Sequence, residues 1–288
     1  GTAAVSRDNG RTFREFASKP TPDAKFGRIA VSATDADNVI WVPMNNGGGA
    51  EPVYFTRDGG KTWDVGSGSP VGMVNGDGPW TFFKPLAADR ETAHTFYIYD
   101  RRDGGFFVSA DGGANWTRRA TLPTQPGNHF DNHQLIAAPG RTGDLWLSLS
   151  DKGLLHSTDA GKTWSRLTGV EWSVRAALGK PAPGSKAPSV YLYGQIGGTS
   201  PKDDLSVDAA LYRSVDSGKS WTRINPVTQG LNGINPLVAD MQVFGRVYVG
   251  TGGRGFFYGE PAAANRVGMP TTRVDKSRSP GAKPDASP

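Results

Sequence analysis

The 288-residue sequence contains no cysteine. A disulfide scaffold, a thiolate metal site and a cysteine nucleophile are therefore excluded. The absence does not identify the cellular compartment, because many secreted bacterial proteins also lack cysteine. No apolar run approaches the length of a membrane span, and no spaced run of Lys and Arg with interleaved aromatic residues follows the pattern of a phosphate-binding surface. We therefore expect neither a membrane nor a nucleic acid as partner.

Outside the C-terminal tail, basic residues exceed acidic residues only slightly. The formal net charge is +5, and residues 261–288 hold five basic and two acidic side chains. These residues are rich in Pro, Ala, Ser and charge and have no apolar period, which predicts a disordered linker or tail. The sequence starts at Gly1 without a signal peptide. We therefore interpret it as a piece of a longer precursor.

Glycine, proline and aromatic residues are abundant. The chain has 39 Gly, 21 Pro, 8 Trp, 8 Tyr and 13 Phe. Such a mixture favours many short strands joined by tight turns, with large rings buried between them. An all-β fold is the expected class.

One short pattern recurs five times: Ser or Thr, any residue, Asp, any residue, Gly, any residue, Thr, Ser or Asn, then an aromatic residue. Successive copies begin 50, 53, 48 and 57 residues apart, which is the size of one four-stranded propeller blade. The copies are Ser6–Phe13, Thr56–Trp63, Ser109–Trp116, Ser157–Trp164 and Ser214–Trp221. The pattern is that of the Asp-box, and it predicts a β-propeller.

The chemistry of each box is local. The Asp carboxylate accepts hydrogen bonds from backbone N–H groups of its own turn, and the Gly two residues later takes the positive φ that closes the turn. The aromatic residue then starts the next strand and packs between neighbouring sheets. We therefore interpret the five aspartates as structural and not catalytic: Asp8, Asp58, Asp111, Asp159 and Asp216.

The segments between boxes read as short strands. Around the fourth box we expect four strands, with the box between the third and the fourth, and the fifth unit repeats this order. A last unit without a box ends near Gly259. Residues 1–260 thus hold about five to six blades' worth of a probable seven-bladed ring, which needs roughly 350 residues at this spacing. We expect the missing part to lie before Gly1.

Three further stretches resemble glycoside hydrolase family 74, the xyloglucanases and related β-1,4-glucanases. Asp-boxes alone are shared with sialidases, sortilin-type receptors and photosystem assembly factors. The terminal stretch Gly245–Gly259 is similar to the final strands of the family, and Pro85–Gly113 and Ala138–Trp164 match its second propeller in order and spacing. The resemblance covers about residues 1–260.

The resemblance implies a secreted enzyme with two seven-bladed propellers that clasp a polysaccharide and hydrolyse a β-1,4-glucan, typically xyloglucan, with inversion. Two carboxylates, one from each propeller, act as acid and base. In the family, the Asp of the second propeller lies in a Gly-Asp…Gly-Phe stretch upstream of the box that corresponds to Ser6–Phe13, before this sequence begins. The N-terminal propeller that holds the other Asp is absent. We therefore assign no catalytic residue.

Other groups of polar residues give weaker evidence for a catalytic or metal-binding site. Asp77 follows the second box, where the family has no catalytic Asp, and Asp144 opens a strand in the fourth blade. His129 and His133 are four residues apart, but they lie on a loop running into a strand and no third metal ligand is evident. The arginine triad and Tyr–Glu pair of a sialidase cannot be assembled. We expect neither a metal nor a cofactor.

Because box turns join third and fourth strands, all boxes lie on one face of the disc, and the opposite face holds the other loops. Binding residues concentrate on such loops, here 44–52, 66–83, 122–132, 168–173, 194–208 and 226–235. We expect Trp80 and Trp172 to form platforms for sugar rings. The predicted polar partners of the sugar hydroxyls are Asn46, His129, Asp131 and Gln195. Alternatively, Trp80 packs on its own loop, with Phe82 and Phe83 beneath it.

Two functions stay open at this point. The first is the C-terminal propeller portion of a secreted xyloglucan-type hydrolase, inactive alone and forming one wall of the polysaccharide cleft with a missing N-terminal propeller. The second is a non-catalytic Asp-box propeller that binds a carbohydrate or a protein. The sequence upstream of Gly1 discriminates between them.

Overall fold

The computed structural model describes residues 3–22, 24, 26–44, 51–73, 83–125, 133–197, 209–226, 231 and 233–261. Within these residues the regular structure consists of β-strands. The described residues contain no helix long and apolar enough to cross a membrane.

The strands form antiparallel sheets that follow one another along the chain. The first sheet pairs β1 (Ala4–Val5) with β2 (Arg14–Glu15). The second sheet contains β3 (Phe26–Val31), β4 (Val39–Met44), β5 (Tyr54–Thr56) and β6 (Asp64–Val65). The third contains β7 (Leu86–Ala88), β8 (Phe96–Asp100), β9 (Gly105–Ser109) and β10 (Thr117–Thr121). The fourth contains β11 (His133–Ala137), β12 (Leu145–Leu149), β13 (Leu154–Ser157) and β14 (Ser165–Arg166). The fifth contains β15 (Val170–Gly179), β16 (Ser189–Ile196), β17 (Ala210–Ser214) and β18 (Thr222–Arg223). The last sheet has β19 (Ile234–Ala239), β20 (Val247–Thr251) and β21 (Phe256–Gly259).

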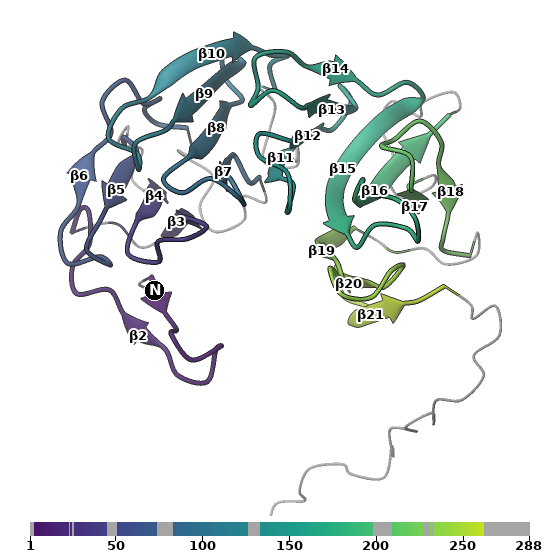
Figure 1. Ribbon diagram of the computed structural model, residues 1–288, viewed down its shortest axis with the longest axis horizontal. Helices are drawn as coiled ribbons and strands as arrows, with labels where there is room; N and C mark the ends of the chain where they lie inside the picture. Colours follow the sequence, from purple (N-terminus) through teal and green to yellow (C-terminus); the bar gives the residue numbers. More distant parts are fainter. Residues whose placement is uncertain are drawn as a thin grey trace, which may run out of the picture.

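The sheets are arranged radially along an open arc (Figure 1). The first strand of each four-stranded sheet lies on the inside of the arc and the fourth on the outside, as β15 and β18 illustrate. Neighbouring first strands contact one another, β3 with β7, β7 with β11, β11 with β15, and β15 with β19. This arrangement is that of a β-propeller, and the predicted fold class is confirmed.

The predicted strand order of the fourth and fifth units is also confirmed, with each box between the third and fourth strands. Two boundaries differ from expectation. Strand β15 begins at Val170, so Trp172 lies in a strand and not in a loop. Strand β16 continues to Ile196 and includes Gln195. Both strands extend because they pair with each other beyond the apolar run that defined them in the sequence.

The box aspartates hold their own turns, as predicted. In the second box, Asp58 Oδ1 accepts hydrogen bonds from Thr56 Oγ1 at 2.7 Å and from the Thr62 N–H at 3.0 Å, and Oδ2 accepts one from Thr62 Oγ1 at 2.7 Å. The same three bonds recur at Asp8, Asp111, Asp159 and Asp216, with Asn115 donating through its side-chain amide in the third box.

These hydrogen bonds act on the carboxylates electrostatically. The side-chain hydroxyl and backbone N–H of Thr163 lower the pKa of Asp159 to about 2, and those of Ser220 do the same for Asp216. A carboxylate that accepts several hydrogen bonds is stabilised in its charged form. A general acid needs the opposite shift, so the box aspartates are suited to turn closure and not to proton donation.

In the second to fifth boxes the glycine serves both the turn and the packing between blades. Gly161 has φ 79°, and the residue before it, Ala160, is also left-handed at φ 58°. A Cβ on Gly161 would clash with the ring of Phe106 in the preceding sheet. Gly113 likewise approaches Phe55 of the preceding sheet. Only glycine combines the positive φ with this close approach.

The box aromatics pack between sheets, with one exception. The Trp164 ring lies 5.1 Å from that of Phe106, and Trp63 contacts Phe16 at 5.6 Å. Burying such a side chain stabilises the fold by roughly 1.5–3 kcal/mol. Phe13 is 68% exposed, because box aromatics pack against the sheet before their own, and the described residues hold no sheet before that of β1 and β2. The expectation for the first box is therefore wrong within the described residues.

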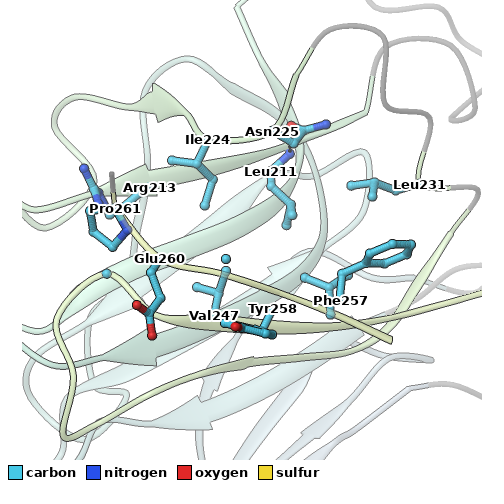
Figure 2. A pocket seen from close by; sticks show the side chains of 13 residues that line it. Leu211, Arg213, Ile224, Asn225, Leu231, Val247, Phe257, Tyr258, Glu260 and Pro261 are labelled. Atoms are coloured by element: carbon cyan, nitrogen blue, oxygen red, sulfur yellow. Dashed lines mark hydrogen bonds between the residues drawn. The ribbon is translucent and has the colours of Figure 1, made fainter. Parts of the chain in front are cut away.

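A groove of about 370 Å³ separates the last two sheets (Figure 2). Leu211 and Ile224 line one side, and Val247, Phe257 and Tyr258 line the other. At this junction the packing of the blades is thus less complete than at the junctions that contain a box tryptophan.

Candidate functional site

The topology places the candidate site on the face opposite the boxes. Each box turn follows a third strand, so first strands begin, and second strands end, at the other face. Four of the predicted site residues lie outside the described residues: Asn46, Trp80, His129 and Asp131. The two that the structure describes are Trp172 and Gln195.

Trp172 and Gln195 are brought together as backbone partners in the β15–β16 ladder, next to a register shift. Trp172 is half-buried and packs against the apolar cluster that contains Tyr193 and Leu231. Its indole Nε1 is buried and has no hydrogen-bond partner among the described residues, and Gln195 is 9% exposed.

The same end of the inner strands holds a group of basic side chains around one ring. The ring of Phe83, which precedes β7, is 1% exposed. Arg101 lies over it with Cζ at 4.8 Å from the ring centroid, and Arg28 lies at 6.0 Å. His133 stacks on Phe83 with centroids 5.0 Å apart. We call Arg28, Lys84, Arg101, His133 and Arg175 the axial basic cluster.

Four members of the axial basic cluster lie in or just before inner strands, and Arg101 follows β8. Arg28 lies in β3 and donates through Nε to the Phe83 carbonyl at 2.7 Å. Lys84 forms a parallel bridge with Gln134, and its N–H donates to the His133 carbonyl at 2.8 Å. Neighbouring blades are therefore tied together at the backbone where the basic side chains gather.

Mutual repulsion and burial shift the titration of this cluster. Burial lowers the pKa of Arg175 to about 10, with Arg28 contributing in the same direction. Burial, followed by the charges of Arg175 and Arg28, lowers the pKa of Lys84. His133 is 1% exposed, and burial together with Arg101 and Arg175 holds its pKa well below the usual value. The His133 imidazole is thus neutral at pH 7.

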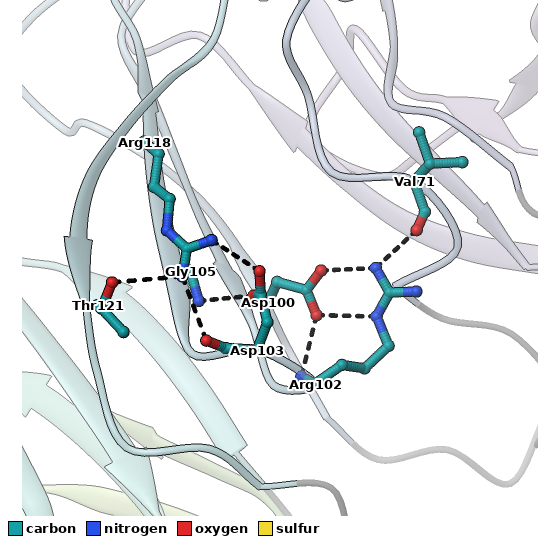
Figure 3. Close-up of polar contacts among 7 residues, drawn as sticks. All are labelled: Val71, Asp100, Arg102, Asp103, Gly105, Arg118 and Thr121. Atoms are coloured by element: carbon teal, nitrogen blue, oxygen red, sulfur yellow. Dashed lines mark hydrogen bonds and ion pairs between the residues drawn. The ribbon is translucent and has the colours of Figure 1, made fainter.

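Arg101 lies in the turn between β8 and β9, and polar contacts of the neighbouring residues Asp100, Arg102 and Asp103 hold this turn (Figure 3). Arg102 forms a two-pronged pair with Asp100 at 3.0 and 2.6 Å and donates to the Val71 carbonyl of the preceding blade at 2.6 Å. Asp103 accepts from Arg118 at 2.7 Å and from the Gly105 N–H at 2.8 Å. Burial raises the pKa of Asp103, but the hydrogen bonds and the charge of Arg118 outweigh burial, so the pKa lies below its usual value. The loop is therefore a rigid part of the face.

Asp144 is engaged within the protein. Its carboxylate accepts from Trp146 Nε1 at 2.8 Å and Arg141 Nε at 2.7 Å, and lies 2.9 Å from His156 Nε2. The His156 ring stacks on Trp146 with centroids 3.9 Å apart. Burial raises the pKa of Asp144, but His156, Arg141 and Trp146 together outweigh burial, so the pKa lies below its usual value. This arrangement favours a structural role, and Asp77 lies outside the described residues.

The axial basic cluster was not predicted from the sequence. His133 was considered only as a partner of His129, and Arg28, Lys84 and Arg175 lie far apart in the chain. The available signal was a basic residue in or just before the first strand of several units. Within the described part of the chain, no group of three or more His, Cys, Asp or Glu side chains is placed to hold a metal ion.

The five engaged boxes and the radially arranged antiparallel sheets define an Asp-box β-propeller. A family model described as BNR/Asp-box repeat matches residues 155–166. The xyloglucanase Xgh74A of Acetivibrio thermocellus is 34% identical over 276 residues, which cover 95% of this chain and 29% of that protein. An oligoxyloglucan-reducing end-specific xyloglucanase of Emericella nidulans is 32% identical over 283 residues, covering 90% of this chain and 32% of that protein.

Solved structures agree with these relatives. The crystal structure of the GH74 enzyme of Niastella koreensis matches with a TM-score of 0.71 and 31% identity, over 88% of this chain and 33% of that chain. The chain is a xyloglucanase-like propeller portion of the glycoside hydrolase family 74 type. It spans about a third or less of the length of the relatives that it matches.

Proposed function

We propose that the chain is the C-terminal propeller portion of a secreted β-1,4-glucan hydrolase of the xyloglucan type and forms one wall of the polysaccharide cleft. The observation that carries this proposal is the similarity to xyloglucanases over at least 90% of the chain, at 32–34% identity. The chain's own box aspartates are all engaged in turns. Both catalytic aspartates are therefore proposed to lie upstream of Gly1.

The face opposite the boxes is the proposed wall. Trp172 supplies one of the two aromatic platforms proposed for sugar rings, and Gln195 is its cross-strand neighbour. The indole N–H of Trp172 is buried and has no hydrogen-bond partner among the described residues. Trp80, Asn46, His129 and Asp131 are proposed to complete the sugar contacts.

The test compares this 288-residue chain with the intact polypeptide that contains it. Xyloglucan hydrolysis is followed by the release of reducing ends at equal molar concentration. We expect hydrolysis by the intact polypeptide and none by the chain alone, because an inverting reaction needs a pair of carboxylates and both are proposed to lie upstream of Gly1. Hydrolysis by the chain alone overturns the placement of the catalytic residues. An intact polypeptide that leaves xyloglucan and other β-1,4-glucans unchanged overturns the hydrolase and favours a binding propeller.

A further inference from the structure

The axial basic cluster gathers positive charge at one end of the inner strands. Its members come from successive sheets: Arg28 lies in β3, Lys84 just before β7, Arg101 after β8, His133 at the start of β11 and Arg175 in β15. Like charges that share a partly buried site repel one another, and burial adds the cost of removing each charge from water. Titratable groups perturbed in this way are typical of binding and catalytic sites.

Lys84 lacks a counter-ion among the described residues. Its side chain is half-buried, and its ammonium has no hydrogen-bond acceptor or carboxylate partner there. Burial, Arg175 and Arg28 all disfavour its charge. An ammonium group carries three N–H donors, so a negatively charged group beside Lys84 would offset the repulsion and use these donors.

His133 offers a second group without a partner. It is 1% exposed, and neither of its ring nitrogens has a hydrogen-bond partner among the described residues. The ring stacks on Phe83 and meets Tyr99 edge-on at 5.2 Å, contacts that any aromatic ring could make. A neutral imidazole carries one N–H donor, and leaving a buried donor unpaired is costly. The nitrogens of His133 thus have no role in packing.

The two groups share their charged neighbours. Arg175 and Arg28 act on both Lys84 and His133, and the Lys84 N–H donates to the His133 carbonyl at 2.8 Å. His133 and Arg175 are buried, whereas Arg28, Lys84 and Arg101 are half-buried. The cluster therefore has a buried base and a rim that reaches solvent, as a site for a small ligand requires.

The turn after β8 holds its part of the cluster in place. Arg102 is engaged by Asp100 and the Val71 carbonyl, and Arg118 is engaged by Asp103 (Figure 3). Arg101, between these pairs in the chain, lies over the Phe83 ring instead. A positive site that is already ordered binds an anion without the cost of arranging its side chains.

We propose that the axial basic cluster binds a single oxyanion group, of the size of a carboxylate or a phosphate, which accepts hydrogen bonds from the Lys84 ammonium and the His133 N–H. Arg28 and Arg175 supply the surrounding positive potential. The oxyanion comes either from a free anion or from an acidic sugar of a polysaccharide. The site itself does not depend on hydrolysis, and only the second source rests on the proposed function, in which this face is a wall of the cleft.

Isothermal titration calorimetry of the intact polypeptide at neutral pH tests the site. The probes are inorganic phosphate, glucuronate and a β-1,4-linked oligoglucuronate, with sodium chloride holding the ionic strength constant and glucose as the neutral control. We expect saturable binding of at least one anion, a higher unfolding temperature in its presence, and no binding of glucose. Tighter binding of the oligoglucuronate than of glucuronate assigns the site to a polysaccharide, and equal or weaker binding assigns it to a free anion. No saturable binding of any of the three overturns the proposal.

Two variants test the assigned donors. Lys84→Met should weaken anion binding roughly tenfold or more, since a charge-assisted hydrogen bond is lost. Lys152→Met is the matched control and should leave the affinity unchanged, because Lys152 is exposed and pairs with Asp151.

His133→Phe keeps a stacked ring and leaves the charge at neutral pH unchanged, so it separates direct contact from the field of the cluster. This variant should weaken anion binding several-fold. Unchanged affinity in folded Lys84→Met or in folded His133→Phe overturns the proposal. Xyloglucan hydrolysis is measured separately, so an intact polypeptide that lacks hydrolysis but binds the anion refutes the proposed function and leaves the site intact.

Discussion

Trp172 and Gln195 are backbone partners across β15 and β16, although the sequence suggests two separate loops for them. Trp172 packs with one side on the apolar cluster of the fifth and last sheets, and its buried Nε1 makes no hydrogen bond. We expect Trp172→Ala, made in the intact polypeptide, to weaken the binding of xyloglucan oligosaccharides by roughly 5- to 30-fold, the effect of losing about 1–2 kcal/mol of ring contact. Isothermal titration calorimetry gives the dissociation constant.

The control for this variant is Trp172→Phe, which keeps the apolar ring and removes the N–H. If the ring is the platform, the Phe variant should bind much more tightly than the Ala variant. Unchanged affinity in Trp172→Ala, with the thermal unfolding temperature reduced, would assign Trp172 to the core alone.

Gly161→Ala should destabilise the propeller more than the same change at Gly140. Both glycines have positive φ, 79° and 74°, but a Cβ on Gly161 clashes with Phe106, while one on Gly140 meets nothing within 4 Å. The left-handed backbone costs about 1 kcal/mol at either position, and overpacking adds roughly 1–3 kcal/mol at Gly161. Urea unfolding measures the difference, and equal losses at both positions would contradict the close packing of boxes between blades.

Asp159→Ala should lower stability without changing the chemistry. The substitution leaves the Thr163 N–H and the Ser157 hydroxyl without their acceptor. We expect the unfolding temperature to fall by about 2–8 °C, while kcat of the folded intact polypeptide is unchanged. Asp64→Ala, on the exposed strand β6, serves as the control. Loss of kcat at full folding would assign a catalytic role to a box aspartate.

The box aspartates and His133 give stability a pH dependence in two windows. The pKa values of Asp159 and Asp216 are lowered from 3.8 to about 2 in the folded state, so their contribution is present above pH 4 and is lost as pH falls toward 2. The His133 pKa is also lowered in the folded state, so the unfolded chain binds a proton first, and stability falls as pH drops below 6.5.

His133→Phe isolates the second window. The ring stacks on Phe83 and its nitrogens make no hydrogen bonds, so phenylalanine can replace it without losing a polar contact. One proton bound only by the unfolded state gives a slope of up to about 1.4 kcal/mol per pH unit. The variant should reduce the slope of urea stability between pH 6.5 and 5 by up to this amount. An unchanged slope in the variant would show that other groups control this window.

Lys84→Met should raise stability at low ionic strength. Burial, Arg175 and Arg28 all disfavour the charge of Lys84, and methionine keeps most of its apolar stem. The urea midpoint should rise, and the gain should shrink as salt screens the repulsion. Lys152→Met is the matched control, because Lys152 pairs with Asp151 at 2.7 Å on the surface and gains nothing from neutralisation. A lower midpoint for Lys84→Met would reveal a stabilising partner for this ammonium.

The Asp-box pattern made the fold and the strand order predictable. Within one turn the Gly60 N–H donates to Thr56 Oγ1 and the Thr62 N–H donates to Asp58 Oδ1, so the spacing of these residues is sufficient to define the geometry. The apolar runs of the fourth unit similarly define β11–β14. Family resemblance from Pro85–Gly113, Ala138–Trp164 and Gly245–Gly259 led to the xyloglucanase-like type that the relatives support.

The sequence by itself thus determined what depends on neighbours along the chain: the box turns, the blade repeat and the fold class. Only the tertiary structure decided which side chains meet across blades. It extended β15 so that Trp172 lies opposite Gln195, gathered Arg28, Lys84 and Arg175 at the inner strands, and left the groove beside Leu211. The physical reason is that hydrogen bonds in a turn are set by short spacing, whereas contacts between blades depend on the angle and register of whole sheets, which no local pattern encodes.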